Sequence, residues 1–457
     1  MGKLAVVAGA VAVAAVGVVG GSYVVGGKVE DGFRAAVAKA ASGGITVRVL
    51  DYERGIFGAK ANTMWTVQGE DEPFDFTVSH AIEHGPLPAG KAAQIHSVLN
   101  LPEGVKQVFD EFLKGRAALE LATTVGWSGA QQHVLSSPDV VASVGPMSAT
   151  WGGLRGEITV DADWRVMKGQ ASAPVFRMKS EDGERIELEG LTMSFDSSKP
   201  QGRQFWVGPG KVALERLAVI TEESGELEAA GLVIDSDMQL KGDVVEMTID
   251  GALRKLGVDG EKVDDLALRL ALRNLDAGVL DRFTQLIDSL GRDGEDAEAQ
   301  NARVLAAFAQ EGPALLKRKP EIQIERVAGR TAEGVTEFGM RLAYVGEAPE
   351  RFNPFTDLAA GMNVSVPKAL LERAMQGQVH DEVVEFLETK EVEVSEEEMA
   401  EGVREAARER IDELVAKGML VGRDQAWTLQ ADFAGGEFKL NGKAASPADL
   451  QELGLPL

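Results

Sequence analysis

The sequence predicts an α+β protein: one N-terminal transmembrane helix, then a large, twisted, bulged antiparallel β-sheet with two helical segments packed against it. Three observations predict this class. They are an uncharged run at the N-terminus, repeated apolar–polar alternation over residues 45–275, and apolar stripes at helical spacing over residues 276–318 and 367–418. A chain of 457 residues with 44% hydrophobic residues is also long and apolar enough to build a packed core.

The N-terminal run covers residues 4–27 and contains no charged side chain. As a helix it would be about 36 Å long, enough for a bilayer core of about 30 Å. Small-residue cleavage sites such as Ala10-Val11-Ala12 lie in the middle of the run, which favours an uncleaved anchor over a signal peptide. Because Lys3 precedes the run, the positive-inside rule predicts that residues 1–3 are cytoplasmic and that the body of the protein lies outside the membrane.

The charge balance excludes several classes of partner. The chain has 72 acidic and 47 basic residues, and its net charge of −25 would repel the phosphates of nucleic acids. It has no cysteine, so disulfides and thiolate zinc sites are excluded. We therefore expect membrane contact through residues 4–27 and no nucleic-acid partner, while the oligomeric state is left open.

Residues 28–44 predict a juxtamembrane helix that ends at Gly43-Gly44, and residues 45–275 predict a β-rich region. Alternation is regular at Leu266, Leu268, Leu270 and Leu272, which would share one face of a strand.

Two segments of the β-rich region, at residues 186–195 and 212–221, share a shift of one residue in the middle of their alternation. Because strict alternation cannot shift on one flat face, we expect a β-bulge at Glu189-Gly190 and another at Glu215-Arg216.

The rest of the chain predicts a helical segment at residues 276–318, strands at 319–366, and a second helical segment at 367–418. Ser395 and Glu398 form the pattern of a capping box, and Gly418 ends that helix. Residues 419–457 predict a hairpin that turns at Gly435-Gly436, followed by an Asn441-Gly442 turn that leads to a capping helix.

The sequence HAIEH at residues 80–84 has the H-x-x-E-H order of a zinc peptidase motif, which requires a helix. Phe74, Phe76 and Val78 set a period of two that leads into His80, and Gly85-Pro86 follows His84. On a strand the two histidines would be about 13 Å apart, too far to share one zinc ion with bonds of about 2.1 Å. We therefore expect a strand that runs into a tight turn.

Other catalytic patterns are incomplete. In VGPGKV at residues 207–212, Val212 stands where a phosphate loop needs Ser or Thr, and GWSGA at residues 126–130 lacks the last glycine of a nucleophile elbow. The sequence therefore predicts no catalytic residue, no cofactor and no metal ligand.

Several motifs together resemble the YdgA-like proteins of Gram-negative bacteria, a family of unknown function. The most specific are Tyr52-x-Arg54-Gly55-x-Phe57, His84-Gly85-Pro86 and Leu440-Asn441-Gly442, all of which we expect to have structural roles. The resemblance implies attachment to the inner membrane by a single span, with a periplasmic body, and it supplies no catalytic residues.

Three functions follow as hypotheses. The first is a non-enzymatic envelope protein that binds a partner or supports the cell envelope. The second is a carrier of lipids or other hydrophobic ligands, in which leucine-rich faces such as Leu266 to Leu272 line a groove instead of a closed core. The third is a periplasmic hydrolase, which would need a polar cluster around His80, His84 or His133 in a concave pocket.

Overall fold

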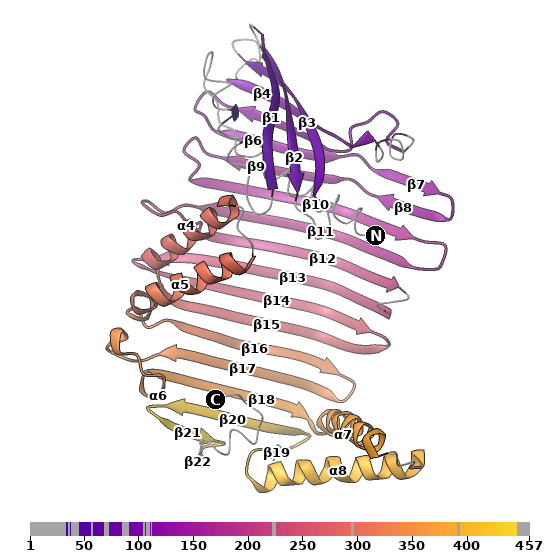
Figure 1. Cartoon of the computed structure of the whole chain (residues 1–457), viewed down its shortest axis with the longest axis vertical. Helices are drawn as coiled ribbons and strands as arrows, with labels where there is room; N and C mark the ends of the chain where they lie inside the picture. Colours follow the sequence, from indigo (N-terminus) through magenta and orange to yellow (C-terminus); the bar gives the residue numbers. More distant parts are fainter. Residues whose placement is uncertain are drawn as a thin grey trace. The chain divides into compact units, whose positions relative to one another are not determined.

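The computed structural model describes residues 33–34, 37, 45–55, 58–67, 73–84, 91–103, 106, 110, 112–221, 225–293, 297–390 and 394–445. The chain divides into two compact units. Unit 1 comprises residues 1–240 and 277–311, and unit 2 comprises residues 241–276 and 312–457. Both consist mainly of antiparallel strands with few helices (Figure 1), which confirms the predicted sheet-rich α+β class.

The predicted membrane anchor at residues 4–27 lies outside the described residues. So does most of the predicted juxtamembrane helix, of which Phe33, Arg34 and Val37 are described and helical. In the part of the chain that the structure describes, no helix has both the length and the apolar character needed to cross a bilayer.

The strands of unit 1 follow one another as an antiparallel meander. The first are β1 (Ile45–Arg54), β2 (Gly58–Val67), β3 (Phe74–His84), β4 (Ala93–Asn100), β5 (Glu120–Val125) and β6 (Gln131–Ser137). The chain continues through β7 (Val140–Val144), β8 (Met147–Trp151) and β9 (Leu154–Val160), and both β8 and β9 pair with β10 (Val166–Lys179). Three long strands complete the unit: β11 (Arg185–Ser198), β12 (Gly208–Thr221) and β13 (Gly225–Lys241).

The predicted bulges have a different form in the structure. Regular pairing is interrupted at one row that crosses four strands, in which Pro174, Gly190, Glu215 and Gly231 lie opposite one another. Gly190 has φ of +64° and Gly231 of +70°, so a residue in the left-handed region interrupts the pleat and the alternation restarts beyond it. In each of the four strands the side chains that face one side of the sheet switch from odd to even positions, or the reverse, at this row, which we call the kink row. Because all four strands switch together, the pairing register is the same on both sides of it.

The short strands at the start of unit 1 enclose a packed core. Its fully buried members are Ile45, Trp65, Phe76, Val78, Leu99 and Leu119. The ring of Trp65 stacks on that of Phe76 with centroids 6.1 Å apart. These residues alternate with partly or fully exposed ones along β2 and β3, as a sheet with one buried face requires.

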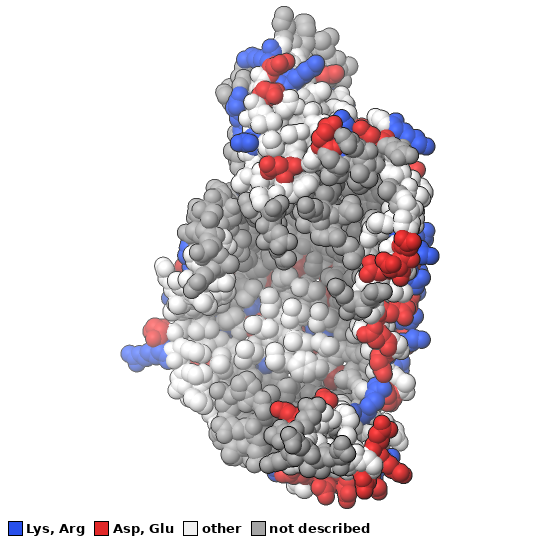
Figure 2. All heavy atoms as spheres, turned by 45° about the vertical axis from the view of Figure 1, so that its right-hand side comes forward, with Lys and Arg blue, Asp and Glu red and all other residues white. Residues whose placement is uncertain are grey.

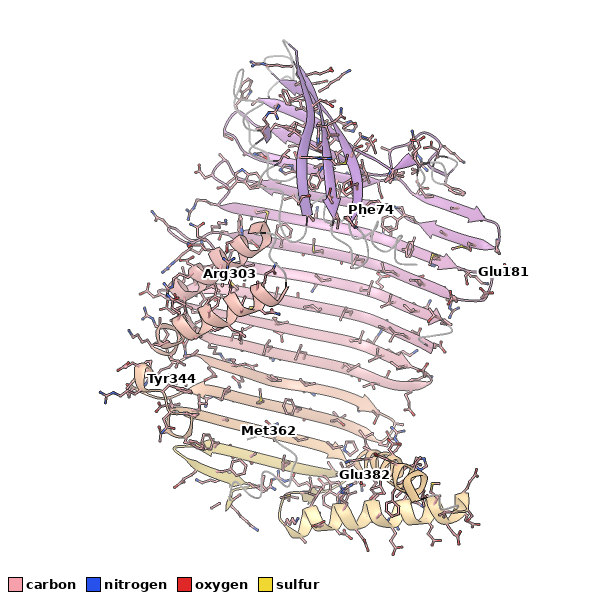
Figure 3. All side chains as sticks on the ribbon, viewed as in Figure 1. Phe74, Glu181, Arg303, Tyr344, Met362 and Glu382 are labelled. Carbon is pink, nitrogen blue, oxygen red and sulfur yellow. The ribbon has the colours of Figure 1, made fainter. Side chains whose placement is uncertain are left out.

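Two helices follow the strands in sequence, α4 (Ala277–Asp293) and α5 (Ala297–Leu316). Arg303 of α5 (Figure 3) donates to Ser289 of α4 at 3.0 Å, and the rings of Phe283 and Phe308 lie 4.5 Å apart. Asp281 ties α4 to the loop after β11, since it accepts hydrogen bonds from Arg203 at 3.1 Å and from the backbone N–H of Gln204 at 2.8 Å.

Unit 2 is a second antiparallel meander. Its strands are β14 (Val244–Val258), β15 (Glu261–Asp276), β16 (Glu321–Thr331), β17 (Gly334–Tyr344), β18 (Leu358–Pro367), β20 (Ala426–Ala434), β21 (Glu437–Leu440) and β22 (Lys443–Ala445), with β19 (Val421–Arg423) beside β20. Between β17 and β18 lie a 3₁₀ turn (Pro349–Arg351) and the short helix α6 (Pro354–Asp357).

The helices of unit 2 form a hairpin of α7 (Lys368–Lys390) and α8 (Glu396–Ala416). The capping box of Ser395 and Glu398 is confirmed at the start of α8. Val379, Val403 and Ala407 make the buried seam between the two helices, and Arg410 pairs with Glu382 at 3.1 Å across it (Figure 3).

The end of the chain differs from the prediction in one respect. The Asn441-Gly442 turn leads into the strand β22, not into a capping helix. Asn441 has φ of +50° and Gly442 of +80°, the pair of left-handed residues that closes a two-residue hairpin and returns the chain antiparallel to itself. Residues 446–457 lie outside the described residues.

Candidate apolar binding faces

The long strands of unit 1 carry apolar side chains in rows across one face, which we call the unit 1 face. Alternation puts the residues of each row on one side of the sheet, and strand pairing sets them side by side. The rows are Ala171–Met193–Val212–Ile234, Phe176–Leu188–Leu217–Ala229 and Met178–Ile186–Val219–Leu227.

Unit 2 repeats this arrangement over six strands, from β14 to β20, in what we call the unit 2 face. Its rows are Met247–Leu272–Ile322–Leu342–Ala360–Phe433, Ile249–Leu270–Ile324–Met340–Met362–Ala431 and Gly251–Leu268–Val327–Phe338–Val364–Leu429. Met362 lies in the middle of β18 (Figure 3). At ordinary strand and residue spacing these rows span roughly 24 Å by 14 Å. An area of this size, about 300–600 Å², is that of the largest apolar patch on a typical monomer, which is often functional.

The opposite side of each sheet is polar and held together by ion pairs. In unit 1, Arg216 pairs with Glu187 at 3.0 Å, and Lys168 pairs with Asp196 at 2.8 Å. In unit 2, Glu321 receives both Arg341 at 2.6 Å and Arg273 at 3.1 Å. The hydrogen bond from Arg341 is the main cause of the lowered pKa of Glu321. Each sheet is therefore amphipathic, with its charges on one side.

Both apolar faces are open over part of their area. At β18 and β20 the unit 2 face is covered, because Met362, Leu429 and the buried Ala431 pack with Met419 and Leu440. On the unit 1 face Met193 keeps 41% of its surface exposed, and on the unit 2 face Leu268 keeps 41% and Ile322 keeps 42%. Every residue of β11 and β13 retains some exposure. Figure 2 shows few charged side chains over the strands, whereas acidic and basic side chains gather along the strand ends. These faces are therefore available to an apolar ligand.

The first predicted motif forms a strand–turn–strand. Tyr52 lies on β1 opposite Ala61 and contacts the ring of Phe33 at 5.7 Å. Arg54 ends β1, and the backbone N–H of Gly55 donates to the carbonyl of Gly58 at 2.7 Å. Phe57 lies outside the described residues.

The H-x-x-E-H segment is a strand. β3 runs through His84, so the period of two predicted the backbone correctly and the helix required by a zinc peptidase is not formed. Gly85 and Pro86 lie outside the described residues. Among the described residues, no three histidine or carboxylate side chains are grouped closely enough to hold a metal ion.

His80 belongs to a buried polar row that sequence reasoning missed. Thr63, His80, Ser97, Thr123 and His133 come from the consecutive strands β2 to β6, and each is at most 4% exposed. The indole N–H of Trp65 donates to Thr63 at 2.8 Å. His80 Nε2 lies 3.0 Å from Thr63 Oγ1, and His80 Nδ1 lies 2.8 Å from Ser97 Oγ. The one signal in the sequence is that His80 continues the inward phase of Phe76 and Val78.

Both buried histidines are held neutral. Burial lowers the pKa of His80 to about 4 and that of His133 to about 4, because the charged imidazolium loses its solvation. Nδ1 of His133 lies 2.9 Å from Thr123 Oγ1. Nε2 of His133 and the side-chain amide of Gln131 are buried and have no hydrogen-bond partner among the residues that the structure describes. His80 and His133 stand on strands three positions apart, about 14 Å at ordinary strand spacing, so the two rings do not form a shared catalytic cluster.

The C-terminal motif is a structural anchor. Leu440 is buried. The side chain of Asn441 accepts from the backbone N–H of Gln430 at 2.8 Å and donates to the carbonyls of Gly418 at 2.8 Å and Met419 at 3.0 Å. One amide therefore joins the β21–β22 turn, β20 and the end of α8, and Gly442 completes the turn.

Comparison with known proteins adds one match. A family model described as "Bacterial protein of unknown function (DUF945)" matches residues 1–448. No curated protein and no solved structure matches the chain.

Proposed function

The chain belongs to the bacterial family of unknown function DUF945, and from that premise we propose that it is a non-enzymatic envelope protein that binds lipid hydrocarbon chains on its open sheet faces. The observation that carries this proposal is the set of cross-strand apolar rows with exposed members, such as Leu268 and its pairing partner Val327 in unit 2. Of the functions that the sequence suggested, this is the carrier of hydrophobic ligands.

The energetics favour reversible loading from a membrane. Burial of one methylene group from water contributes about 0.8 kcal/mol. A lipid chain that leaves a bilayer is already out of water, and lipid tails are as apolar as leucine side chains, so its transfer to an apolar protein face is close to neutral. Such a face can therefore accept a chain and release it again, as a carrier must.

The negative charge of the protein restricts which lipid headgroups are expected to bind. A net charge of −25 disfavours an anionic headgroup near the strand ends, where carboxylates such as Glu181 lie (Figure 3). We therefore expect zwitterionic phospholipids to be bound in preference to anionic ones.

The proposal includes the location predicted from the sequence. Residues 4–27 would anchor the protein in the inner membrane, with residues 1–3 in the cytoplasm and the body in the periplasm, as expected for a YdgA-like protein. Because the chain has no cysteine, a single cysteine introduced at the exposed Thr248 reports the compartment. A membrane-impermeant maleimide should label it when only the outer membrane is opened; labelling that requires lysis would refute the periplasmic location.

Photo-crosslinking of the full-length protein in cells tests the binding face. A photoreactive benzoylphenylalanine at Leu268 or Met193 should yield phospholipid adducts that mass spectrometry identifies. The matched controls are Thr248 and Ser194, which are exposed on the opposite sides of the same sheets. Equal adducts on both sides would show nonspecific membrane contact, and protein adducts without lipid would favour a partner-binding or structural role.

A further inference from the structure

Among the described strands, the β7–β8 hairpin of unit 1 has one edge without a pairing partner. β7 pairs with β8 from Val140 opposite Trp151 to Val144 opposite Met147, and this is its one pairing with the described strands. The preceding strand β6 lies beside β5, but β5 begins at Glu120, opposite Ser136. β7 continues beyond β6 in the same direction, since β6 pairs with β9, β7 pairs with β8, and both β8 and β9 pair with β10. It therefore lies beyond the start of β5.

The hairpin turn determines which backbone groups face outward. Gly145 has φ of +59° and is followed by Pro146, the arrangement of a two-residue type II′ loop. Its closing pair, Val144 and Met147, exchanges both hydrogen bonds, and bonded pairs then alternate with non-bonded pairs along an antiparallel ladder. The N–H and C=O groups of Val141 and Ser143 consequently point away from β8.

On the outer edge, the carbonyl of Asp139, just before β7, has a hydrogen-bond donor within the chain. The guanidinium of Arg116 donates to the carbonyl of Asp139 at 2.7 Å. No described residue bonds to the outward groups of Val141 or Ser143, and the side chain of Val141 is 72% exposed. The outward groups of these two residues are spaced for the backbone of another strand.

A contrast with β1 shows that this edge has neither a bulge nor a charged residue. β1 pairs with β2 on one side, its register shifts between Val49 and Asp51, and it carries the charged residues Arg48, Glu53 and Arg54. Bulges and charges are the usual means of blocking edge-to-edge pairing. Residues 140–151, which form the β7–β8 hairpin, contain no charged residue at all.

We infer that β7 is a docking edge for an extended segment of a partner protein, which adds to the sheet as a new strand by pairing with Val141 and Ser143. The absence of charge excludes recognition by ion pairs, so backbone hydrogen bonds supply the affinity and alternate side chains the specificity. Val140 and Ala142 lie in phase with Trp151, whose ring lies 6.4 Å from that of Phe176. The segment should therefore carry apolar residues at every second position toward that side, with small or polar residues between them.

A synthetic peptide tests this inference on the full-length protein in detergent. The probe is a fluorescent peptide of alternating threonine and valine with a lysine at each end, measured by anisotropy. We expect binding with a micromolar Kd, and at least a tenfold loss with Val141→Pro, which removes the outward N–H while proline remains tolerated on an edge strand. Val141→Thr keeps the N–H and should bind as the wild type does.

Three results of the peptide measurement would overturn the inference. They are an unchanged Kd in Val141→Pro that retains the wild-type circular dichroism, equal binding of the same peptide with N-methylated backbone, and no binding at 1 mM peptide. Concentration-dependent self-association that Val141→Pro abolishes would assign the edge to a second copy of this chain and would also overturn it. None of these outcomes depends on lipid binding by the apolar faces.

Discussion

Two regions of unit 1 use the same alternation and reach opposite results. In β2 and β3 the inward residues Trp65 and Phe76 are 1% and 4% exposed, whereas in β11 Met193 is 41% exposed. Both regions place apolar residues on one side of antiparallel strands with polar residues between them. The difference teaches that alternation determines which side of a sheet is apolar, while a second layer of packing determines whether that side becomes a core.

The largest expected difference between the two regions is the loss of unfolding free energy when an apolar side chain is truncated. Trp65→Ala should lower the free energy of unfolding by about 3–5 kcal/mol, because it leaves a cavity in a closed core. Met193→Ala should lower it by less than about 1 kcal/mol, since an exposed side chain leaves no cavity. Urea unfolding followed by circular dichroism measures both. Similar costs for the two variants would mean that the unit 1 face is covered.

Acid should lower the stability of the region with the buried core, β2 to β6, more than that of the open region, β11 to β13. The pKa of His80 and of His133 is lowered by burial to about 4, from an ordinary value near 6.5. Between these values the unfolded chain binds more protons than the folded one, so the stability present above about pH 6.5 is lost as the pH falls toward 4. The loss is on the order of 3 kcal/mol for each histidine.

Hydrogen exchange at pH 7 and pH 5 checks this prediction. Amides of β3 to β6 should lose protection at the lower pH more than amides of β11 to β13 do. A variant with both His80→Asn and His133→Asn serves as the control and should show a smaller difference between the two pH values. Equal losses in the two regions of the wild type would contradict the assignment to these histidines.

The kink row predicts a smaller effect in the open region. Gly190→Ala should destabilise the protein by about 1–2 kcal/mol, because φ is +64° and an added Cβ would lie 2.3 Å from the side chain of Glu215. Gly183→Ala is the matched control, with φ of +87° and no atom within 4 Å of the added Cβ. Denaturant unfolding of the two variants separates the crowding from the backbone strain. Equal costs would show that Glu215 moves aside freely.

The smallest expected effect is that of a polar substitution on the open face. Met193→Thr should change the free energy of unfolding by about 0.5 kcal/mol or less, since surface substitutions rarely cost more. Val78→Thr in the closed core of β3 should cost about 1–3 kcal/mol, because it buries a hydroxyl group. Thermal unfolding of the pair measures the difference, and a large loss in Met193→Thr would contradict an open face.

Much of the backbone could be predicted from the sequence because its signals are local. The alternation through Phe76 and Val78 predicted that His80 lies on a strand, and Ser395 with Glu398 predicted the start of α8. The shift of phase near Gly190 was also visible. Its alignment with Pro174, Glu215 and Gly231 was not, because strand register brings those residues together over long sequence separations.

The candidate sites were only partly predictable for the same reason. The sequence showed that Leu266 to Leu272 share a face, but it left open whether that face is a closed core or an open groove. The buried polar row was missed because Thr63, Ser97 and Thr123 are ordinary strand residues until pairing places them beside His80 and His133. The unpaired edge of β7 likewise depends on where β5 begins.

By itself the sequence determined the antiparallel, amphipathic strands of this protein, since alternation and turn residues act over a few neighbouring positions. Only the tertiary structure decided which apolar side is covered, because burial depends on segments distant in the chain. Trp65 and Leu268 obey the same local rule, yet one fills a core and the other remains exposed to a ligand.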